Sequence, residues 1–314
     1  MKKLKIIFFG SPSYSVPLLD RIINLGHDVQ LVVSQGTNKI RRGKRVITAI
    51  HEYCLDNNID CITPSTFDSE TFQIIKSSHA DLGMVYAYGK LIPEDIINLF
   101  EHGIINLHCS LLPSYRGAAP IQHALINDEK FTGFTFFKID EKLDEGQILL
   151  KEKYEIKEID NCSSIQDNLT FLATAKLSDA ITKIINNDYL ASNENIRTSY
   201  ARKVLKEDSF FSWDDNVRMI FNKIRAYHLW PIASTELFNE KIKVIDADYL
   251  SESHGLPFGR IKEFSKKNLL VTANGGYLSI KKLQLEGMRP ISNVDLFNGH
   301  SKFRDRLLLD LSDN

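Results

Sequence analysis

The 314-residue sequence lacks several features that define other classes of protein. Its four cysteines include no C-x-x-C pair, so we expect reduced thiols rather than a disulfide framework or a structural zinc site. No apolar run approaches the roughly 18–20 residues of a membrane span. The N-terminal apolar run stops at Gly10, too early for a signal peptide. We therefore expect a cytoplasmic protein that does not enter a membrane.

Common motifs for nucleotides and catalytic zinc are absent as well. The turn after the first predicted strand, 10–15, has no G-x-G-x-x-G pattern, and Pro12 removes an amide that could bind a pyrophosphate. There is no Walker A sequence, and His51-Glu-Tyr-Cys54 is not H-E-x-x-H. These absences argue against a dinucleotide-dependent enzyme and against a zinc hydrolase.

What is present is the composition of a globular protein with room for two domains. The chain is 43% hydrophobic and 25% charged, with a formal net charge of -1. Residues 201–314 hold 18 basic and 15 acidic side chains, whereas residues 1–200 hold the other 21 and 25. The second part is thus mildly basic, and binding of a nucleic acid would need a local patch.

Short apolar runs alternate with amphipathic stretches over residues 1–187, which predicts an α/β domain with a mostly parallel sheet. We expect strands over 4–9, 29–33, 61–63, 82–85, 103–107, 132–139 and 148–156. Helices are expected over 16–25, 51–55, 67–75, 93–100, 121–127 and 162–185. Ser163 or Ser164 is expected to cap the last helix.

Residues 188–205 are predicted to be a linker, and the pattern changes beyond them. A helix is expected over 215–226, then short strands over 233–238, 242–246, 259–264, 269–272 and 277–285. Short strands at this spacing predict a small antiparallel, OB-like β-barrel over 206–314. One closing helix is expected over 292–303.

Two polar side chains, Asn106 and His108, end a predicted buried strand. Alternate residues of a strand share a face, so both groups point the same way. Burying them is costly unless they are hydrogen-bonded or used in function. Cys109 points to the other face, which argues against a Cys–His pair. Asp144 lies in an acidic turn after a later strand, where its charge could equally be solvated.

These residue types suit acyl transfer. An amide and an imidazole can donate hydrogen bonds to an oxyanion, and a carboxylate can orient the imidazole or accept a proton. Elsewhere, residues 39–45 place five cations around Gly43. This run could be a solvated surface loop or a loop that binds phosphates. Gly89, at a strand end, permits a plain turn or close approach of a ligand.

The runs 106–122 and 143–146 together resemble the signature of the 10-formyltetrahydrofolate-dependent formyltransferases. The resemblance extends to 10–17, 87–89, Thr132-Gly133, Trp230-Pro231 and 297–299. It implies a Rossmann-like catalytic domain (1–187) and an OB-like tRNA-binding domain (206–314). It also implies an enzyme of translation initiation that transfers the formyl group of 10-formyltetrahydrofolate to the α-amino group of methionyl-initiator tRNA by direct amine attack.

The resemblance assigns roles to residues at matching positions. Asn106 and His108 would stabilise the oxyanion, and Asp144 would orient His108 and assist proton movement. The formyl-folate site would contain Ala87, Tyr88, Gly89, Ser110, Leu111, Leu112, Pro113 and Asp140. Contacts with the tRNA would come from Arg41, Arg42, Lys44 and Arg45. The resemblance requires no metal, and we expect a monomer.

The sequence departs from the family pattern in three places. Residues 35–40 replace a Gln-Pro-Asp stretch, Cys109 stands where a smaller residue is usual, and Glu145 and Gln147 flank Gly146 in place of Thr and Asp. Two rival hypotheses are a nucleotide-sugar N-formyltransferase with the same folate chemistry and a non-catalytic RNA-binding module. Retention of all three candidate catalytic residues argues against the second.

Overall fold

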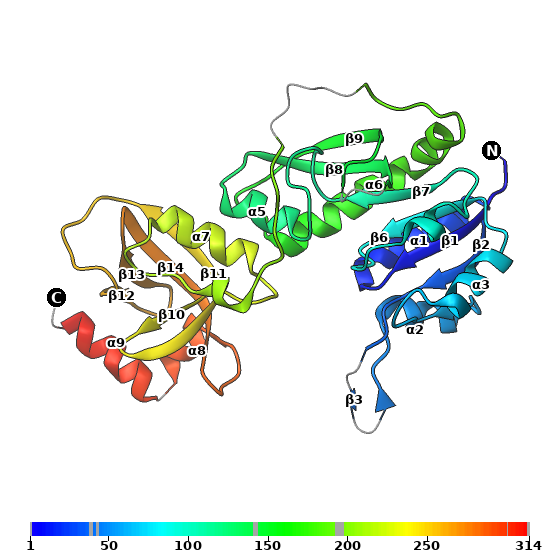
Figure 1. Cartoon of the computed structure of the whole chain (residues 1–314). Coiled ribbons are helices and arrows are strands. Elements are labelled where there is room, and N and C mark those ends of the chain that lie inside the picture. The colour runs from blue at the N-terminus through cyan, green and yellow to red at the C-terminus, as the bar shows by residue number, and fades with distance from the viewer. Residues whose placement is uncertain are drawn as a thin grey trace. The chain divides into compact units, whose positions relative to one another are not determined.

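The computed structural model describes residues 2–37, 40–41, 44–140, 144–191, 198–299 and 301–312, and it divides into two compact units (Figure 1). Unit 1 comprises Met1–Pro120, Phe131–Ile156 and Ile165–Arg202, and unit 2 comprises Ile121–Lys130, Lys157–Ser164 and Lys203–Asn314. Two short pieces of the N-terminal half therefore cluster with the C-terminal part. The domain limits predicted at 187 and 206 stay a prediction.

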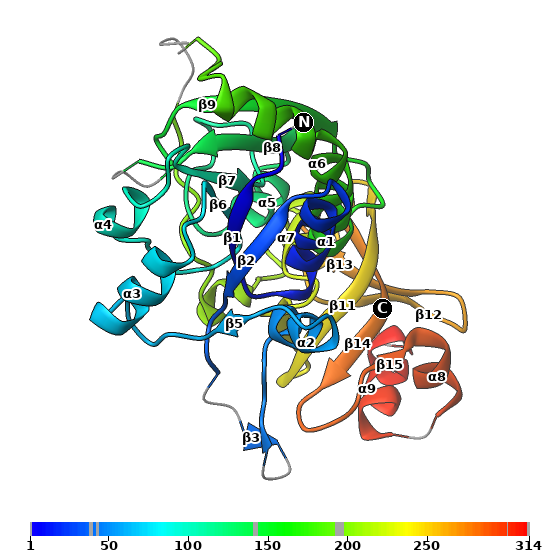
Figure 2. The same cartoon turned by 90° about the vertical axis from the view of Figure 1, so that its right-hand side faces the viewer.

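Unit 1 is built on a seven-stranded sheet in the order β5-β2-β1-β6-β7-β8-β9. The first five strands in this order are parallel, and β8 and β9 are antiparallel, which confirms the mostly parallel sheet. Figure 2 shows β2, β1, β6 and β7 side by side. The strands are β1 (Lys5–Gly10), β2 (Asp28–Val33), β5 (Cys61–Ile62), β6 (Leu82–Tyr86), β7 (Ile104–His108), β8 (Phe131–Lys138) and β9 (Ile148–Glu155).

Burial explains why the central strands read as continuous apolar runs. Ile6, Ile7, Phe8 and Phe9 of β1 have no exposed surface, because helices cover both faces of a parallel sheet. The helical segments of the N-terminal part are η1 (Ser13–Ser15), α1 (Val16–Asn24), α2 (Ala49–Asp56), α3 (Ser69–Ser77), α4 (Glu94–Ile97), α5 (Pro120–Ile126) and α6 (Cys162–Ile185). Each predicted strand and helix of this part is present, with ends shifted by a few residues.

The predicted cap of α6 was wrong. The side-chain oxygen of Asn161 accepts hydrogen bonds from the backbone N–H groups of Ser163 and Ser164, at 2.9 and 3.0 Å. Asn is as good a capping residue as Ser, and Asn161 precedes the first helical residue. The two serines therefore lie inside the first turn.

Two short strands of the basic segment pair with each other and stand away from the seven-stranded sheet in Figures 1 and 2; they are called the hairpin. Strands β3 (Ile40–Arg41) and β4 (Lys44–Arg45) pair antiparallel, with Arg41 opposite Lys44. Arg42, one of the predicted tRNA-binding residues, lies outside the described residues. The hairpin begins and ends beside β2 and α2, where Ser34 Oγ and Thr48 Oγ1 are 2.7 Å apart.

Unit 2 contains an antiparallel sheet in the order β10-β11-β14-β13-β12, with β15 paired to β14. Its elements are η2 (Lys206–Ser209), α7 (Val217–Ala226), β10 (Ser234–Leu237), β11 (Glu240–Ser251), β12 (Ile261–Phe264), β13 (Leu269–Ala273), β14 (Gly276–Leu285), β15 (Ile291–Ser292), α8 (Asn293–Asn298) and α9 (Lys302–Ser312). Apolar residues of α7, α8 and α9 join the inward-facing strand residues in one core. A small antiparallel domain was therefore correctly predicted.

The single closing helix predicted over 292–303 was wrong. Helix α8 ends before Gly299, and a second helix, α9, begins at Lys302. The hydroxyl of Ser301 accepts a hydrogen bond from the backbone N–H of Arg304 at 3.1 Å and so caps the second helix. The helical spacing of apolar residues continues across the break between α8 and α9, so the sequence pattern did not reveal two helices.

Arg218 explains why residues 121–130 and 157–164 belong to unit 2. It projects from α7 and donates to Asp128 at 2.8 Å and to Glu158 at 2.6 Å. Nearby, Asn222 Nδ2 also donates to Asp128, at 3.0 Å. Hydrogen bonds and ion pairs from α7 thus attach both residues 121–130 and residues 157–164 to unit 2.

No helix in the described part of the chain is long and apolar enough to cross a membrane.

Candidate active site

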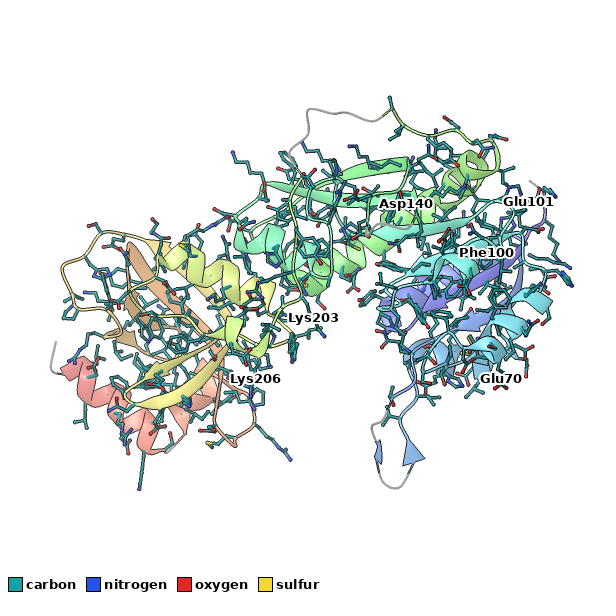
Figure 3. All side chains as sticks on the ribbon, in the orientation of Figure 1. Glu70, Phe100, Glu101, Asp140, Lys203 and Lys206 are labelled. Carbon is teal, nitrogen blue, oxygen red and sulfur yellow. The ribbon has the colours of Figure 1, made fainter. Side chains whose placement is uncertain are left out.

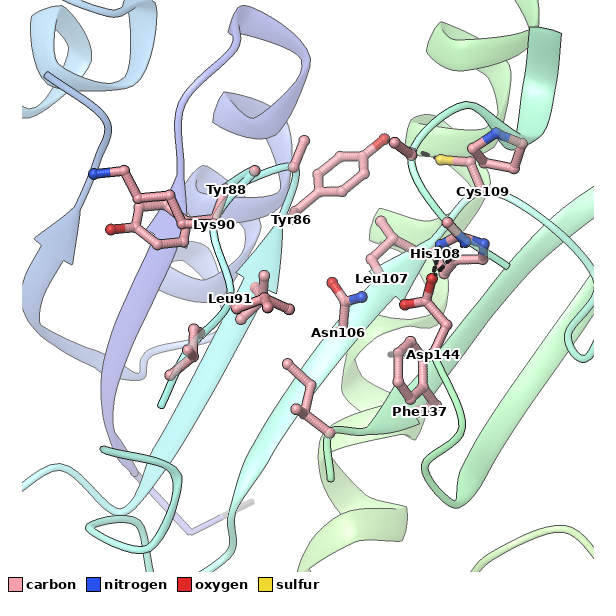
Figure 4. A pocket seen from close by; sticks show the side chains of 18 of the residues that line it. Tyr86, Tyr88, Lys90, Leu91, Asn106, Leu107, His108, Cys109, Phe137 and Asp144 are labelled. Atoms are coloured by element: carbon pink, nitrogen blue, oxygen red, sulfur yellow. Dashed lines mark hydrogen bonds and ion pairs between the residues drawn. The ribbon is translucent and has the colours of Figure 1, made fainter. Parts of the chain in front are cut away.

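A cavity of about 820 Å³ lies at the carboxyl ends of β6 and β7 in unit 1 (Figure 4). This is the edge at which open α/β sheets bind their ligands. Most of its lining comes from the end of β6 and the loop after it, the end of β7, and the loops that follow β7 and β8. Single residues come from η1, α6 and the segment near residue 200, and two come from α4. Elements far apart in sequence therefore build one site.

The three predicted catalytic residues all line this cavity. Asn106 and His108 alternate along β7, and Asp144 arrives from the turn after β8. Figure 4 shows the three side chains converging. The Nδ1 atom of His108 lies 3.8 Å from Oδ2 of Asp144, and each side chain is only 7% exposed. An amide, an imidazole and a carboxylate thus line one cavity, and the imidazole and the carboxylate are nearly buried.

The backbone carbonyl of Tyr115 orients the imidazole of His108. Its oxygen is 2.9 Å from His108 Nε2. A carbonyl oxygen can only accept a hydrogen bond, so the geometry assigns the hydrogen to Nε2. Nδ1, on the side of Asp144, is then the nitrogen that can exchange a proton. The gap of 3.8 Å is longer than a direct hydrogen bond.

Asp144, in the turn after β8, is held by the loop that follows β7. It has a left-handed backbone, with φ 53°, and its Oδ2 accepts a hydrogen bond from the backbone N–H of Gly117 at 2.7 Å. Next to this pair, Arg116 donates to Glu145 at 2.7 Å. The loop containing Tyr115 and Gly117 therefore touches both the imidazole and the carboxylate.

The predicted folate-binding residues fall into two groups. Ala87, Tyr88, Gly89 and Asp140 line the cavity, and Figure 3 labels Asp140 on its loop. Ala87 and Gly89 have positive φ, 53° and 76°, which lets the backbone turn sharply at the rim. The remaining four, Ser110, Leu111, Leu112 and Pro113, are not among the lining residues.

Contacts of Ser110 and Leu112 show where the second group lies instead. Ser110 is buried and its hydroxyl donates to the carbonyl of Ser114 at 2.6 Å. The backbone N–H of Leu112, also buried, donates to Thr135 Oγ1 at 3.1 Å. The stretch directly after β7, residues 110–113, therefore packs against β8 rather than lining the cavity.

Sequence reasoning missed Gln166 of α6, which lines the cavity. Its Nε2 donates to the hydroxyl of Tyr86 at 2.5 Å and to Sγ of Cys109 at 3.3 Å. Burial raises the pKa of the Tyr86 hydroxyl and of the Cys109 thiol, so both stay protonated at neutral pH. Cys109 is thus a packed, hydrogen-bonded thiol. The helical pattern around Gln166 carried no sign of this contact.

Gln35 was also missed as a residue that shapes the rim. Its side-chain N–H donates to the carbonyl of Tyr88, and its backbone N–H donates to Ser11 Oγ at 3.0 Å. It thereby joins the ends of β1, β2 and β6. The possible signal was its place at the end of a buried strand.

Among the described residues, no group of three or more His, Cys, Asp or Glu side chains could hold a metal ion.

Comparison with known proteins identifies the class. Residues 2–181 match the formyl transferase family, and residues 203–301 match the C-terminal domain of formyl transferases. The chain belongs to the formyl transferase family, as the sequence motifs predicted. It is 36% identical to the methionyl-tRNA formyltransferase of Thermodesulfovibrio yellowstonii over 296 residues, covering 94% of this chain and 95% of the relative.

Solved structures share the fold at low sequence identity. HypX from Aquifex aeolicus in complex with tetrahydrofolic acid has a TM-score of 0.67 and 15% identity, covering 94% of this chain and 47% of HypX. The N-formyltransferase from Helicobacter canadensis, in complex with folinic acid and dTDP-3-aminofucose, has a TM-score of 0.66 and 19% identity, covering 89% and 99%. These two likenesses concern the fold alone.

Proposed function

We propose that this chain transfers the formyl group of 10-formyltetrahydrofolate to the α-amino group of methionyl-initiator tRNA. The convergence of Asn106, His108 and Asp144 on one cavity carries the proposal, because formyl transfer needs oxyanion donors and a proton acceptor together. Similarity to methionyl-tRNA formyltransferases over both units supports the choice of acceptor.

The reaction begins when the lone pair of the amine attacks the formyl carbon. The carbonyl π electrons move to oxygen, and the side-chain amide of Asn106 donates to the oxyanion. The tetrahedral intermediate collapses by breaking the bond between the formyl carbon and the folate nitrogen. The amine must lose one proton and the folate nitrogen must gain one, so a proton carrier is needed.

His108 and Asp144 supply that proton path. Because Nε2 of His108 donates to Tyr115, the ring accepts the amine proton at Nδ1. The protonated Nδ1 can then donate to the oxyanion and to the departing nitrogen. Asp144, 3.8 Å away, stabilises the positive ring during this step.

The folate is proposed to occupy the cavity between the β6 loop and Asp140. A volume of about 820 Å³ lies within the range of roughly 300–1,000 Å³ usual for small-ligand sites. The rim at 87–89 offers backbone groups for a flat, polar ring, and Gly89 permits close approach.

The tRNA is proposed to contact the basic hairpin and unit 2. Arg41, Arg42, Lys44 and Arg45 carry four positive charges over five residues, which suits a phosphate backbone. We further propose that the protein acts as a cytoplasmic monomer. A nucleotide-sugar acceptor is the weaker alternative, because the sugar-related likeness is one of fold at 19% identity.

One assay distinguishes the acceptors. The protein is incubated with 10-formyltetrahydrofolate and either methionyl-initiator tRNA or an amino-sugar nucleotide, and formyl incorporation is measured. We expect formylated methionyl-tRNA, and a loss of at least a hundredfold in His108→Ala with an unchanged circular dichroism spectrum. Formylation of the sugar alone would overturn the proposed acceptor, and near-normal activity of His108→Ala would overturn the mechanism.

A further inference from the structure

We propose that Ser199 is a positioning residue for the catalytic imidazole. It belongs to residues 198–202, called the connector, at the end of unit 1. Lys203, labelled in Figure 3, begins the long stretch of unit 2. The kinetic part of this inference rests on the proposed function, whereas the structural part does not.

The connector is bonded to the loop that follows His108. The backbone N–H of Tyr115 donates to Ser199 Oγ at 2.8 Å, and the N–H of Arg116 donates to the Ser199 carbonyl at 2.9 Å. In return, the N–H of Ala201 donates to the Arg116 carbonyl at 2.6 Å, and the N–H of Ala119 donates to the Ala201 carbonyl at 3.3 Å. The connector thus pairs with the loop through an isolated parallel β-bridge between Arg116 and Tyr200.

Tyr115 transmits this attachment to the imidazole. Its backbone is left-handed, with φ 58°, a conformation that costs free energy for a non-glycine residue and needs support from its surroundings. The Ser199 hydroxyl supports it by accepting the Tyr115 N–H, while the Tyr115 carbonyl binds His108 Nε2. Two hydrogen bonds therefore link Ser199 to the ring.

The connector also packs on the residue that holds Asp144. A Cβ placed on Gly117 would lie 2.7 Å from the carbonyl oxygen of Ala201 and 2.9 Å from the Tyr200 ring. These distances leave no room for a side chain. Gly117, at φ 104°, donates its N–H to Asp144. One segment thus fixes both loop residues on which the imidazole and the carboxylate depend.

Loss of the Ser199 hydroxyl has a specific expected effect. The Tyr115 N–H would lose its acceptor, and the loop could leave its left-handed conformation. His108 Nε2 would then lose a fixed partner, so the ring could adopt the other tautomer or turn. The folate rim at 87–89 shares none of these bonds, so binding of folate should be spared.

The experiment compares Ser199→Ala with Ser199→Thr, which keeps a hydroxyl, and with Thr198→Ala, the exposed neighbour. With methionyl-tRNA and 10-formyltetrahydrofolate, we expect kcat of Ser199→Ala to fall on the order of tenfold, with KM for folate within about twofold. Ser199→Thr should recover most of kcat, and Thr198→Ala should match the wild type. Unchanged kcat in Ser199→Ala would overturn the proposal.

A second measurement needs no acceptor and so separates this inference from the proposed function. The ring nitrogens of His108 are observed by NMR and assigned by comparison with His108→Ala. We expect the Nε2–H tautomer in the wild type and in Thr198→Ala, and mixed tautomers in Ser199→Ala. An unaltered His108 signal in Ser199→Ala would overturn the positioning role, even if the natural acceptor proved to be a different amine.

Discussion

Replacing Asp144 with Asn isolates the charge of the proposed catalytic carboxylate. Asn tolerates the left-handed backbone that Asp144 adopts at φ 53°. Its amide oxygen can still accept the hydrogen bond from the Gly117 N–H. The loop should therefore keep its shape, and what is lost is the negative charge beside His108.

The distance between the two side chains sets the size of the effect. Nδ1 of His108 and Oδ2 of Asp144 are 3.8 Å apart, and both side chains are 7% exposed, so water screens them little. Two unit charges at that separation interact by about 4 kcal/mol at an effective dielectric constant of about 20. This corresponds to a rate loss of roughly a thousandfold. In the proposed mechanism Asp144 acts on the ring while the ring carries the amine proton, so the loss should appear in kcat rather than in KM.

The expected thousandfold rate loss is tested by measuring single-turnover formyl transfer at saturating 10-formyltetrahydrofolate. Glu145→Gln is the matched control, because it removes a charge from the adjacent residue, which pairs with Arg116. We expect the control to lose no more than about threefold. If Asp144→Asn were as active as Glu145→Gln, the proposed stabilisation of the protonated His108 ring by the Asp144 charge would be overturned.

Three further predictions concern the hairpin and unit 2. Replacing Arg41, Arg42, Lys44 and Arg45 with Ala should weaken tRNA binding and reduce the slope of log Kd against log salt; an unchanged slope would make the hairpin a solvated surface. Arg218→Ala should lower the free energy of unfolding by about 1 kcal/mol, a modest value because its acidic partners are half exposed, and a calorimetric scan would detect no shift if the pairs were inert. Hydrogen bonding to Arg218 lowers the pKa of Asp128, so the Asp128 carboxylate stabilises the fold above its ordinary pKa, and this contribution is lost as the pH falls through the lowered pKa. Asp128→Asn should therefore lose less stability than the wild type between pH 5 and pH 3 in urea titrations. An identical pH profile of the two proteins would contradict this assignment.

The period of two along β7 was enough to predict that Asn106 and His108 share a face. It follows from strand geometry alone, and both side chains do line the cavity. Asp144 was different, since nothing in its acidic turn distinguished it from solvated neighbours. Only the resemblance to the family selected it, and the bond from Gly117 explains how the fold fixes it there.

Adjacency in sequence was a poor guide to the cavity wall. Ser110, Leu111, Leu112 and Pro113 follow His108 directly, yet the chain turns beneath the site and packs on β8. Gln166 and Tyr200, more than fifty residues away, line the cavity instead. The pattern of one segment encodes which face is apolar, but not which distant segment will cover it.

Residues 188–205 show most clearly that amino-acid composition does not predict backbone hydrogen bonds between distant segments. Residues 186–195 are polar and lack clean periodicity, and a linker over 188–205 was predicted on that ground, yet residues 199–201 bond to the loop after His108. Three of these four bonds join backbone to backbone, and such bonds leave no mark on side-chain composition. The fourth joins Ser199 to Tyr115 across 84 positions. A boundary drawn at 187 would therefore separate the imidazole from the hydroxyl that supports its loop. Unit 1 as a compact body extends to Arg202, and the four bonds to the loop after His108 come from Ser199 and Ala201.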